Sequence, residues 1–86
     1  MIVKLSSLFN SYTQGANELK IDGKTVADVL IELDRIYPGI LFRFINEQDR
    51  IRKHINIFLN QTRIEDININ IKPSDNLFIV QSLSGG

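Results

Sequence analysis

The chain has 86 residues, with ten basic and ten acidic side chains, a formal net charge of zero and no cysteine. It lacks the basic excess of a nucleic-acid binder, and without cysteine it can form no disulfide, thiolate metal site or cysteine nucleophile. No apolar run approaches the roughly 18 residues that a membrane helix needs. Residues Met1–Leu5 are too short an apolar segment for a secretory signal. These features predict one soluble, cytoplasmic domain with no nucleic-acid or membrane partner.

The first part of the sequence predicts a β-hairpin with a long connection. Residues Ile2–Leu5 form a β-branched run that is typical of a strand, and Glu18–Asp22 alternate polar and apolar side chains as a half-buried strand does. Residues 6–16 are mostly polar and are interpreted as the connection, with Phe9 and Tyr12 expected to pack against the body. An Asp-Gly turn then ends the second strand.

One clear helix follows the hairpin and begins at Thr25. A threonine at the N-cap with Asp28 three residues later resembles a capping box, in which side-chain and backbone groups bond reciprocally. Pro38 and Gly39 end the helix, because proline cannot continue it. The apolar residues between these limits recur at the spacing of one buried stripe: Val26, Val29, Leu30, Leu33, Ile36 and Tyr37.

The chain after the helix predicts a short packed segment and two or three further strands. Residues 40–45 are apolar and are expected to form a helical turn or an irregular packed segment, followed by an exposed loop. His54–Asn60 alternate as a strand, and the isoleucines within residues 64–71 alternate with asparagines as in a short edge strand. Proline suits the second position of a turn at Lys72–Asn76, and the last strand begins at Leu77.

This order of elements predicts an α+β fold. A lone helix between two groups of strands indicates a mixed β-sheet of four to five strands packed on one main α-helix. A strand that follows the helix can lie parallel to the first strand only because such a crossover brings the chain back to the same end of the sheet.

The last predicted strand leads to Gly85 and Gly86, where the sequence ends. Glycine has no side chain to pack and loses the most conformational freedom when it is ordered, so a diglycine contributes little to stability. The same lack of Cβ atoms lets the pair thread a narrow channel in an extended conformation and present a carboxylate to a partner. The pair is either a functionless end or a reacting terminus, and its composition alone leaves both open.

The ordered set of segments resembles the ubiquitin-like β-grasp fold and, more closely, the MoaD/ThiS family of sulfur carriers. The helix ending at Tyr37-Pro38-Gly39-Ile40, the Pro-Ser-Asp-Asn turn and the diglycine correspond to features of that family. The run Arg50–Asn60 is similar to a segment of its longer members, which places the resemblance nearest the CysO-like and archaeal MoaD-like branch. It implies a single β-grasp domain over residues 1–83 and a flexible diglycine tail over residues 84–86.

The resemblance implies a carrier and not an enzyme, with no catalytic residue in this chain. The Gly86 carboxylate would be adenylated by a ThiF/MoeB-like adenylyltransferase and converted to a thiocarboxylate, while Ser84 and Gly85 would form the tail. The partner would use ATP, so the chain would bind no cofactor permanently. The sulfur acceptor would be a synthase, either the large subunit of molybdopterin synthase or a cysteine synthase.

Two alternatives to the sulfur carrier remain open from the sequence. The first is a ubiquitin-like modifier that is joined to lysines of other proteins through the same diglycine. The second is a plain interaction domain with an idle tail, for which removal of Gly86 would change nothing. The segment Gln81–Ser84 replaces the proline and small residues that often precede the diglycine in the family, which leaves the identity of the partner enzyme open.

A partner-binding face follows from strand phase once the diglycine is aligned with that of ubiquitin. Successive strand residues point to opposite sides of a sheet, so Phe58, Phe78 and Val80 are expected to form an outward apolar patch. Leu83, beside the tail, is assigned to the same contact. Exposed apolar patches usually mark protein contacts. The alternative is that residues 40–50 fold over this patch and cover it.

The remaining charged residues predict no metal or acid–base site. His54 follows a run of basic residues that could steer an acidic partner, but the run is interpreted as a solvated entrance to a strand. A single histidine without cysteine or clustered carboxylates is not a metal site. The acidic residues are likewise interpreted as a solvated face without a catalytic pair: Asp22, Asp28, Glu65 and Asp66.

Overall fold

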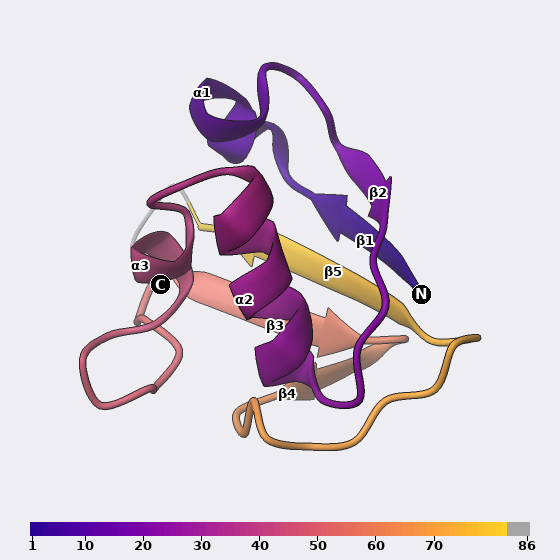
Figure 1. The fold of residues 1–86 in the computed structure, drawn as a ribbon. Coiled ribbons are helices and arrows are strands. Elements are labelled where there is room, and N and C mark those ends of the chain that lie inside the picture. The colour runs from indigo at the N-terminus through magenta and orange to yellow at the C-terminus, as the bar shows by residue number, and fades with distance from the viewer. Residues whose placement is uncertain (83–86) are drawn as a thin grey trace.

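The computed structural model describes residues 1–82, in which a five-stranded sheet packs on one main helix (Figure 1). The strand order is β2-β1-β5-β3-β4, with β1 and β5 parallel and the other neighbouring pairs antiparallel. This arrangement is the predicted mixed sheet of an α+β fold. The elements in chain order are β1 (Ile2–Leu5), η1 (Ser7–Phe9), α1 (Asn10–Thr13), β2 (Glu18–Lys20), α2 (Val26–Ile36), α3 (Leu41–Phe44), β3 (Ile55–Leu59), β4 (Thr62–Ile64) and β5 (Asn76–Gln81).

Helix α2 begins with the predicted capping box. The hydroxyl oxygen of Thr25 accepts a hydrogen bond from the backbone N–H of Asp28 at 3.2 Å, and a carboxylate oxygen of Asp28 accepts from the backbone N–H of Thr25 at 3.1 Å. Two amide groups at the end of the helix are thereby satisfied. The first four members of the predicted stripe are buried with 0% exposure: Val26, Val29, Leu30 and Leu33.

The predicted stripe of α2 is wrong at its C-terminal end. Ile36 is 40% exposed and Tyr37 is half-buried. The helix ends at Ile36 and the backbone of Tyr37 leaves helical geometry, so the stripe is interrupted before its last two members are fully buried. Gly39 then takes a φ of +97°, which glycine adopts without the strain that a Cβ would bring, and the chain turns into α3.

The strand predicted within residues 64–71 is wrong, because the edge strand β4 ends where this segment begins. The segment crosses the N-terminal end of α2 instead. The carbonyl oxygen of Ile67 accepts a hydrogen bond from Ala27 N at 2.7 Å, and that of Ile69 accepts from Val26 N at 3.2 Å. Amides in the first turn of a helix have no partner within the helix, so they bind this segment. The alternating isoleucines therefore reflect packing on a helix end.

The connection between β1 and β2 contains two helical turns, η1 and α1, that its polar composition did not predict. Phe9 and Tyr12 pack against the body as predicted, with Phe9 buried and Tyr12 half-buried. The ring of Phe9 meets that of Phe44 edge to face, with the centroids 5.2 Å apart. This contact joins the connection to α3 and explains why a polar segment is ordered.

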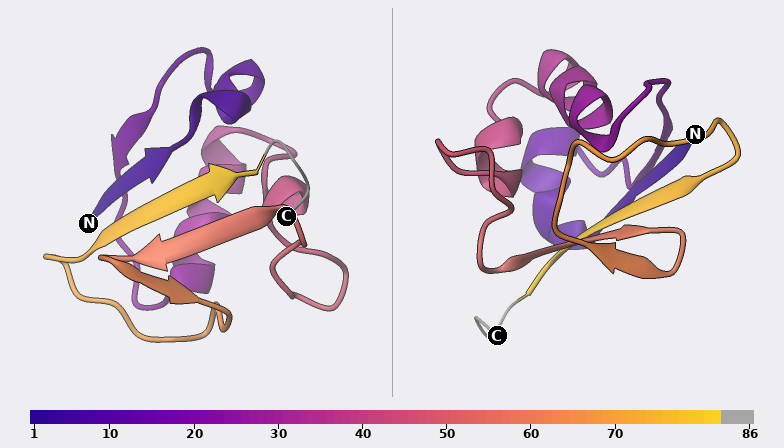
Figure 2. Two further views of the ribbon diagram at one scale, coloured as in Figure 1. Left: turned by 180° about the vertical axis from the view of Figure 1, so that it is seen from behind. Right: turned by 90° about the horizontal axis from the view of Figure 1, so that it is seen from below.

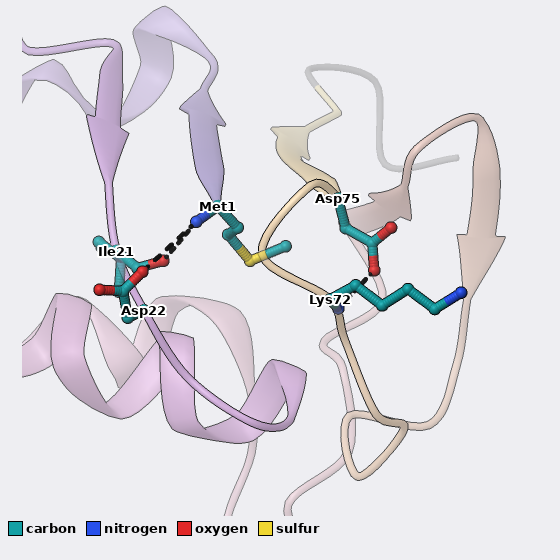
Figure 3. A network of polar contacts seen from close by, with 5 residues as sticks. All are labelled: Met1, Ile21, Asp22, Lys72 and Asp75. Carbon is teal, nitrogen blue, oxygen red and sulfur yellow. Dashed lines mark hydrogen bonds and ion pairs between the residues drawn. The ribbon is translucent and has the colours of Figure 1, made fainter.

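The starts of β1 and β5 lie at the same end of the sheet, where Figure 3 shows their polar contacts. The α-amino nitrogen of Met1 donates a hydrogen bond to the carbonyl oxygen of Ile21 at 3.2 Å and lies 3.7 Å from a carboxylate oxygen of Asp22. Asp75 N donates to the carbonyl oxygen of Lys72 at 3.0 Å, and Asp75 accepts from Lys72 N at 2.8 Å. The predicted turn, with proline at its second position, is confirmed.

The core lies between α2 and the inner face of the sheet, and its buried residues range from Met1 to Ile79. Helices α2 and α3 lie on the same side of the sheet (Figure 2). Within residues 1–82, no helix has the length and apolar character needed to cross a membrane. The predicted division at residue 83 stays a prediction, because residues 83–86 lie outside the described part of the chain.

Candidate functional site

Strand β5 carries two of the residues predicted to bind a partner, and its alternation is confirmed. Leu77 and Ile79 are 0% exposed and belong to the core beneath α2. Phe78 points to the other face and is 42% exposed, and Val80 lies on that same face and is half-buried. A central strand with one buried face and one open face places its outward side chains within reach of another protein.

Strand β3 contributes the third predicted residue. Phe58 lies directly opposite Phe78 in the antiparallel ladder, and Asn56 lies opposite Val80. Phe58 is half-buried, so Phe78 is the most exposed of the three and the patch is less exposed than predicted. Phe58, Phe78 and Val80 share the outer face of two adjacent strands, and they are called the outer patch below.

Charged side chains flank the outer patch along one row across the sheet. Lys4 of β1 is in register with Phe78, and Arg63 of β4 is in register with Phe58. The Nζ atom of Lys4 lies 3.9 Å from a carboxylate oxygen of Glu18, an exposed pair of the kind that contributes little to stability. The row therefore has an aromatic centre and a cation at each side, a composition suited to a protein contact.

The segment 40–50 does not cover the outer patch. Helix α3 lies on the α2 side of the sheet, and no described element lies over the opposite side in the two views of Figure 2. Phe44 anchors α3 in the core with 0% exposure, and the loop from Glu47 to Arg50 stays exposed. The alternative in which this segment folds over the patch is therefore wrong.

The last two described residues, Gln81 at the end of β5 and Ser82 after it, are held by hydrogen bonds from both sides. Gln81 N donates a hydrogen bond to the hydroxyl oxygen of Ser6 at 3.3 Å, and Ser82 N donates to the carbonyl oxygen of His54 at 2.8 Å. The Nη2 atom of Arg43 donates to the side-chain oxygen of Gln81 at 3.3 Å. These contacts fix the direction of the chain as it leaves the sheet. The other predicted site residues lie outside the described residues: Leu83, Ser84, Gly85 and Gly86.

Two residues of α3 beside the end of β5 were not identified from the sequence. Arg43 is 38 residues from Gln81 along the chain, and Phe42, which precedes it, is 63% exposed. The sequence signal was limited to an arginine within an apolar segment, and no local pattern connects it to the last strand. His54 is exposed, and its carbonyl group, not its ring, holds Ser82.

Two carboxyl groups have a lowered pKa for structural reasons. The backbone N–H groups of Lys24 and Thr25 hold the pKa of Asp28 below its usual value, because they bind the charged form. The side-chain amide of Asn60 and a backbone N–H of the same turn lower the pKa of Asp75. A helix cap and a turn account for both shifts. Throughout the described 1–82, no three His, Cys, Asp or Glu side chains gather where they could hold a metal ion.

Comparisons with known proteins agree with this geometry. The profile of the ThiS family matches residues 7–86. A chain of the Amycolatopsis orientalis BexX/CysO complex superposes with a TM-score of 0.89 at 22% identity, covering 99% of this chain and 98% of that one. Mycobacterium tuberculosis CysO gives 0.87 at 20% identity, covering 95% and 98%. A search of curated proteins finds no match.

An archaeal structure is more similar in sequence. Small archaeal modifier protein 1 from Methanosarcina acetivorans superposes with a TM-score of 0.81 at 29% identity, and the match covers 99% of this chain and 94% of that one. The resemblance to CysO-like and archaeal members, first inferred from Arg50–Asn60, is thereby confirmed, as is the β-grasp fold. The chain therefore belongs to the ThiS family and is a ubiquitin-like sulfur carrier or modifier, a small carrier protein and not an enzyme.

Proposed function

We propose that this protein is a sulfur carrier that holds sulfur as a thiocarboxylate on Gly86. The observation that carries the proposal is the position of β5, which is the central strand of the sheet and is hydrogen-bonded up to Ser82. Gly86 follows four residues later, with a second glycine before it. A rigid strand that leads into a short segment ending in glycine is suited to deliver a carboxylate into a partner's active site.

The chemistry requires two displacements, both catalysed by a partner. A carboxylate oxygen of Gly86 attacks the α-phosphorus of ATP, the bond from that phosphorus to pyrophosphate breaks, and an acyl-adenylate forms. A sulfide-level nucleophile then attacks the acyl carbon, and the carbon–oxygen bond to AMP breaks. The product is a C-terminal thiocarboxylate, and no oxidant or reductant is consumed. This chain supplies the reacting terminus, and ATP is bound and used by the partner.

The proposed partners are a ThiF/MoeB-like adenylyltransferase and a synthase that accepts the sulfur. The crystal structure of CysO with BexX supports a protein complex of this kind for a related fold. The acceptor is either the large subunit of molybdopterin synthase or a cysteine synthase. We propose that the outer patch of Phe58, Phe78 and Val80, together with Leu83, contacts these partners. The proposal places the protein in the cytoplasm, where ATP is available.

The test is the intact mass of the protein after incubation with its host's extract, ATP and a sulfur source. A matched variant that lacks Gly86 is treated in the same way. The expected result is a mass gain equal to the exchange of one oxygen for sulfur, in the full-length protein alone. An unchanged mass in both samples, with adenylyltransferase activity confirmed in the extract, contradicts the proposal and favours an idle tail or a modifier.

The second candidate function is a protein modifier, and the similarity to small archaeal modifier protein 1 favours it. It uses the same acyl-adenylate, but the amine of a lysine replaces sulfur as the nucleophile and an isopeptide bond forms. Chymotrypsin can cleave after Leu83, so a conjugated lysine would keep the three residues Ser84–Gly86. Lysine peptides that carry this remnant in cells with the full-length protein, and lack it in cells with the Gly86-deleted variant, would establish conjugation.

A further inference from the structure

The end of β5 opens onto a hollow with cationic walls. Its lining includes Arg43, Arg52 and His54, together with the aromatic ring of Phe42 and the side chain of Gln81. The guanidinium of Arg52 donates to the carbonyl oxygen of Phe42 and that of Arg43 donates to Gln81, so both side chains are held at the hollow. The exposed ring of Phe42 gives the same site an apolar contact surface.

Positive charge is concentrated at this end of the molecule, although the whole chain is neutral. A neighbouring hollow shares Arg52 with the first and has one carboxylate, that of Glu65, among its lining residues. The two hollows together contain five of the ten lysines and arginines in the sequence. These five are called the cationic collar: Arg43, Arg50, Arg52, Lys53 and Arg63.

The collar's charges are not neutralised by ion pairs within residues 1–82. The pairs found there join Met1 to Asp22, Lys4 to Glu18 and Arg35 to Glu32, and none includes a collar residue. Asp22 lies beside Met1, at the end of the sheet where β1 and β5 begin (Figure 3), whereas the first hollow lies beside Gln81, where β5 ends. The collar is therefore available to negative charge on another molecule.

The length of the tail brings any enzyme that acts on Gly86 against the collar. Ser82 is bound to the body through the carbonyl of His54, and Gly86 is four residues further along the chain. Four fully extended residues span roughly 14 Å. An active site that reaches the Gly86 carboxylate must therefore approach within that distance of Ser82, so the protein surface around its entrance faces Arg43, Arg52 and Phe42.

We propose that the cationic collar docks on an acidic surface around the active-site entrance of the adenylyltransferase. Carboxylates of that surface pair with Arg43 and Arg52, and an apolar group packs on Phe42. This inference rests on the proposed function and adds the chemistry of the partner's surface. Complementary charge of this kind accelerates association more than it changes the chemical step, and salt weakens it.

The test compares two double variants with equal net charge. Arg43→Gln/Arg52→Gln removes two collar charges, and Lys24→Gln/Lys72→Gln removes two exposed charges near the start of β5. The probe is the purified adenylyltransferase from the same host, assayed by carrier-dependent exchange between ATP and labelled pyrophosphate. We expect the collar variant to lower kcat/KM for the carrier about tenfold at low salt, with little change in kcat. The control variant should stay within about twofold of the wild type.

A second collar variant tests whether a lower rate comes from the loss of charge or from a loss of folding. Arg50→Gln/Lys53→Gln changes exposed side chains for which no hydrogen bond or ion pair is found within residues 1–82, and it should lower kcat/KM in the same direction. The rate with the wild type should fall with added salt, and the rate with each collar variant should fall less steeply. Unfolding midpoints of all variants show whether a loss of rate follows a loss of structure.

The outcomes separate the two proposals. Exchange with the wild type that is insensitive to salt, or that falls equally with the collar and control variants, contradicts the role of the collar and leaves the adenylation step of the proposed function supported. No exchange with the wild type, while the enzyme adenylates a known carrier, contradicts the proposed function and the role of the collar with it.

Discussion

Thr13, at the end of α1, is 3% exposed, and its hydroxyl oxygen has no hydrogen-bond partner within residues 1–82. A buried hydroxyl without a partner loses its bonds to water and gains none in return. Thr13→Val keeps the shape of the side chain and removes this group. We expect the free energy of unfolding to rise by about 1 kcal/mol, measured by chemical denaturation.

Thr62→Val is the control for this prediction, because it makes the same change at an exposed position in β4. It should alter the free energy of unfolding by less than about 0.5 kcal/mol. A lower stability for Thr13→Val than for the wild type would contradict the prediction and would show that the buried hydroxyl is satisfied.

Asp28 makes stability depend on pH through the helix cap. The N–H groups of Lys24 and Thr25 lower its pKa in the folded protein relative to the unfolded chain. Stability from this cap is therefore fully present above the unfolded pKa, near 3.8, and is lost as pH falls through the lowered folded value. We expect Asp28→Asn to be less stable than the wild type at pH 7 and the difference to shrink below about pH 4.

Urea denaturation at several pH values measures this difference. Glu47→Gln, in the exposed loop after α3, removes one carboxylate outside the helix cap and is the matched control for the change in net charge. A constant difference between Asp28→Asn and the wild type across the acid range would mean that the carboxylate contributes nothing through its charge.

At the scale of the elements, the outer face of the sheet is the surface that the proposed partners bind. Phe78 is 42% exposed there, and Ile31 is 58% exposed on α2, on the opposite side of the sheet. Exposed aromatic residues at the centre of an interface often contribute more than 1 kcal/mol to binding. We expect Phe78→Ser to raise the KM for the carrier in pyrophosphate exchange about tenfold, with Ile31→Ser as the control that leaves it unchanged.

Equal effects of the two serine variants would contradict this prediction, because they would indicate a general loss of apolar surface or of folding. Circular dichroism of both variants shows directly whether either of them has lost its fold. If Phe78→Ser alone raises KM and both proteins are folded, the adenylyltransferase binds the outer face of the sheet at Phe78 and not the exposed face of α2 at Ile31.

Elements with a local signal were predictable from the sequence. The capping box of Thr25, the proline turn before β5 and the inward phase of Leu77 and Ile79 each follow from neighbouring residues, and all three are confirmed. The isoleucines of residues 64–71 have the period of a strand, but their carbonyls bind the first amides of α2. Periodicity cannot distinguish a strand from a segment that a helix end holds extended.

The candidate site was likewise predictable only where it depends on neighbouring residues in the sequence. The phase of β5 placed Phe78 on the outer face, because alternation is a property of the strand itself. The contact between Arg43 and Gln81 joins residues 38 apart, and it exists only because α3 packs beside the end of β5. Arg50, Arg52 and Lys53 of the cationic collar belong to the basic run that was visible in the sequence. Tertiary packing leaves no local pattern, so the positions of Arg43 and Arg63 beside that run could not be derived from the sequence.

At the scale of the whole molecule, the fold joins the two ends of the described chain. Strand β1 pairs with β5 in parallel, and one core includes residues from Met1 to Ile79. The N-terminal and C-terminal parts of the chain both contribute to this one core, and neither part can form it alone. We therefore expect two-state unfolding. Far-UV circular dichroism and the fluorescence of Tyr12 and Tyr37, in a chain without tryptophan, should give coincident urea transitions.

The two tyrosines lie in α1 and at the end of α2, away from the outer strands of the sheet. A tyrosine transition at lower urea than the loss of circular dichroism would therefore show that the connection between β1 and β2, around Tyr12, melts separately from the sheet together with the end of α2 at Tyr37. That result would contradict the single core and would assign the helical turns of this connection to a less stable unit.

The parallel pairing of β1 with β5 also has a mechanical consequence. Met1 lies at the beginning of β1, and Ser82 lies just beyond the end of β5, at the opposite end of the sheet. A force that pulls these two residues apart acts along the strands and loads the hydrogen bonds between them in shear. The hydrogen bonds between the two strands share the load, because a force along the strands stretches all of them at once and does not open them one after another. The strand that presents the tail is thus also the one best placed to withstand tension applied through it.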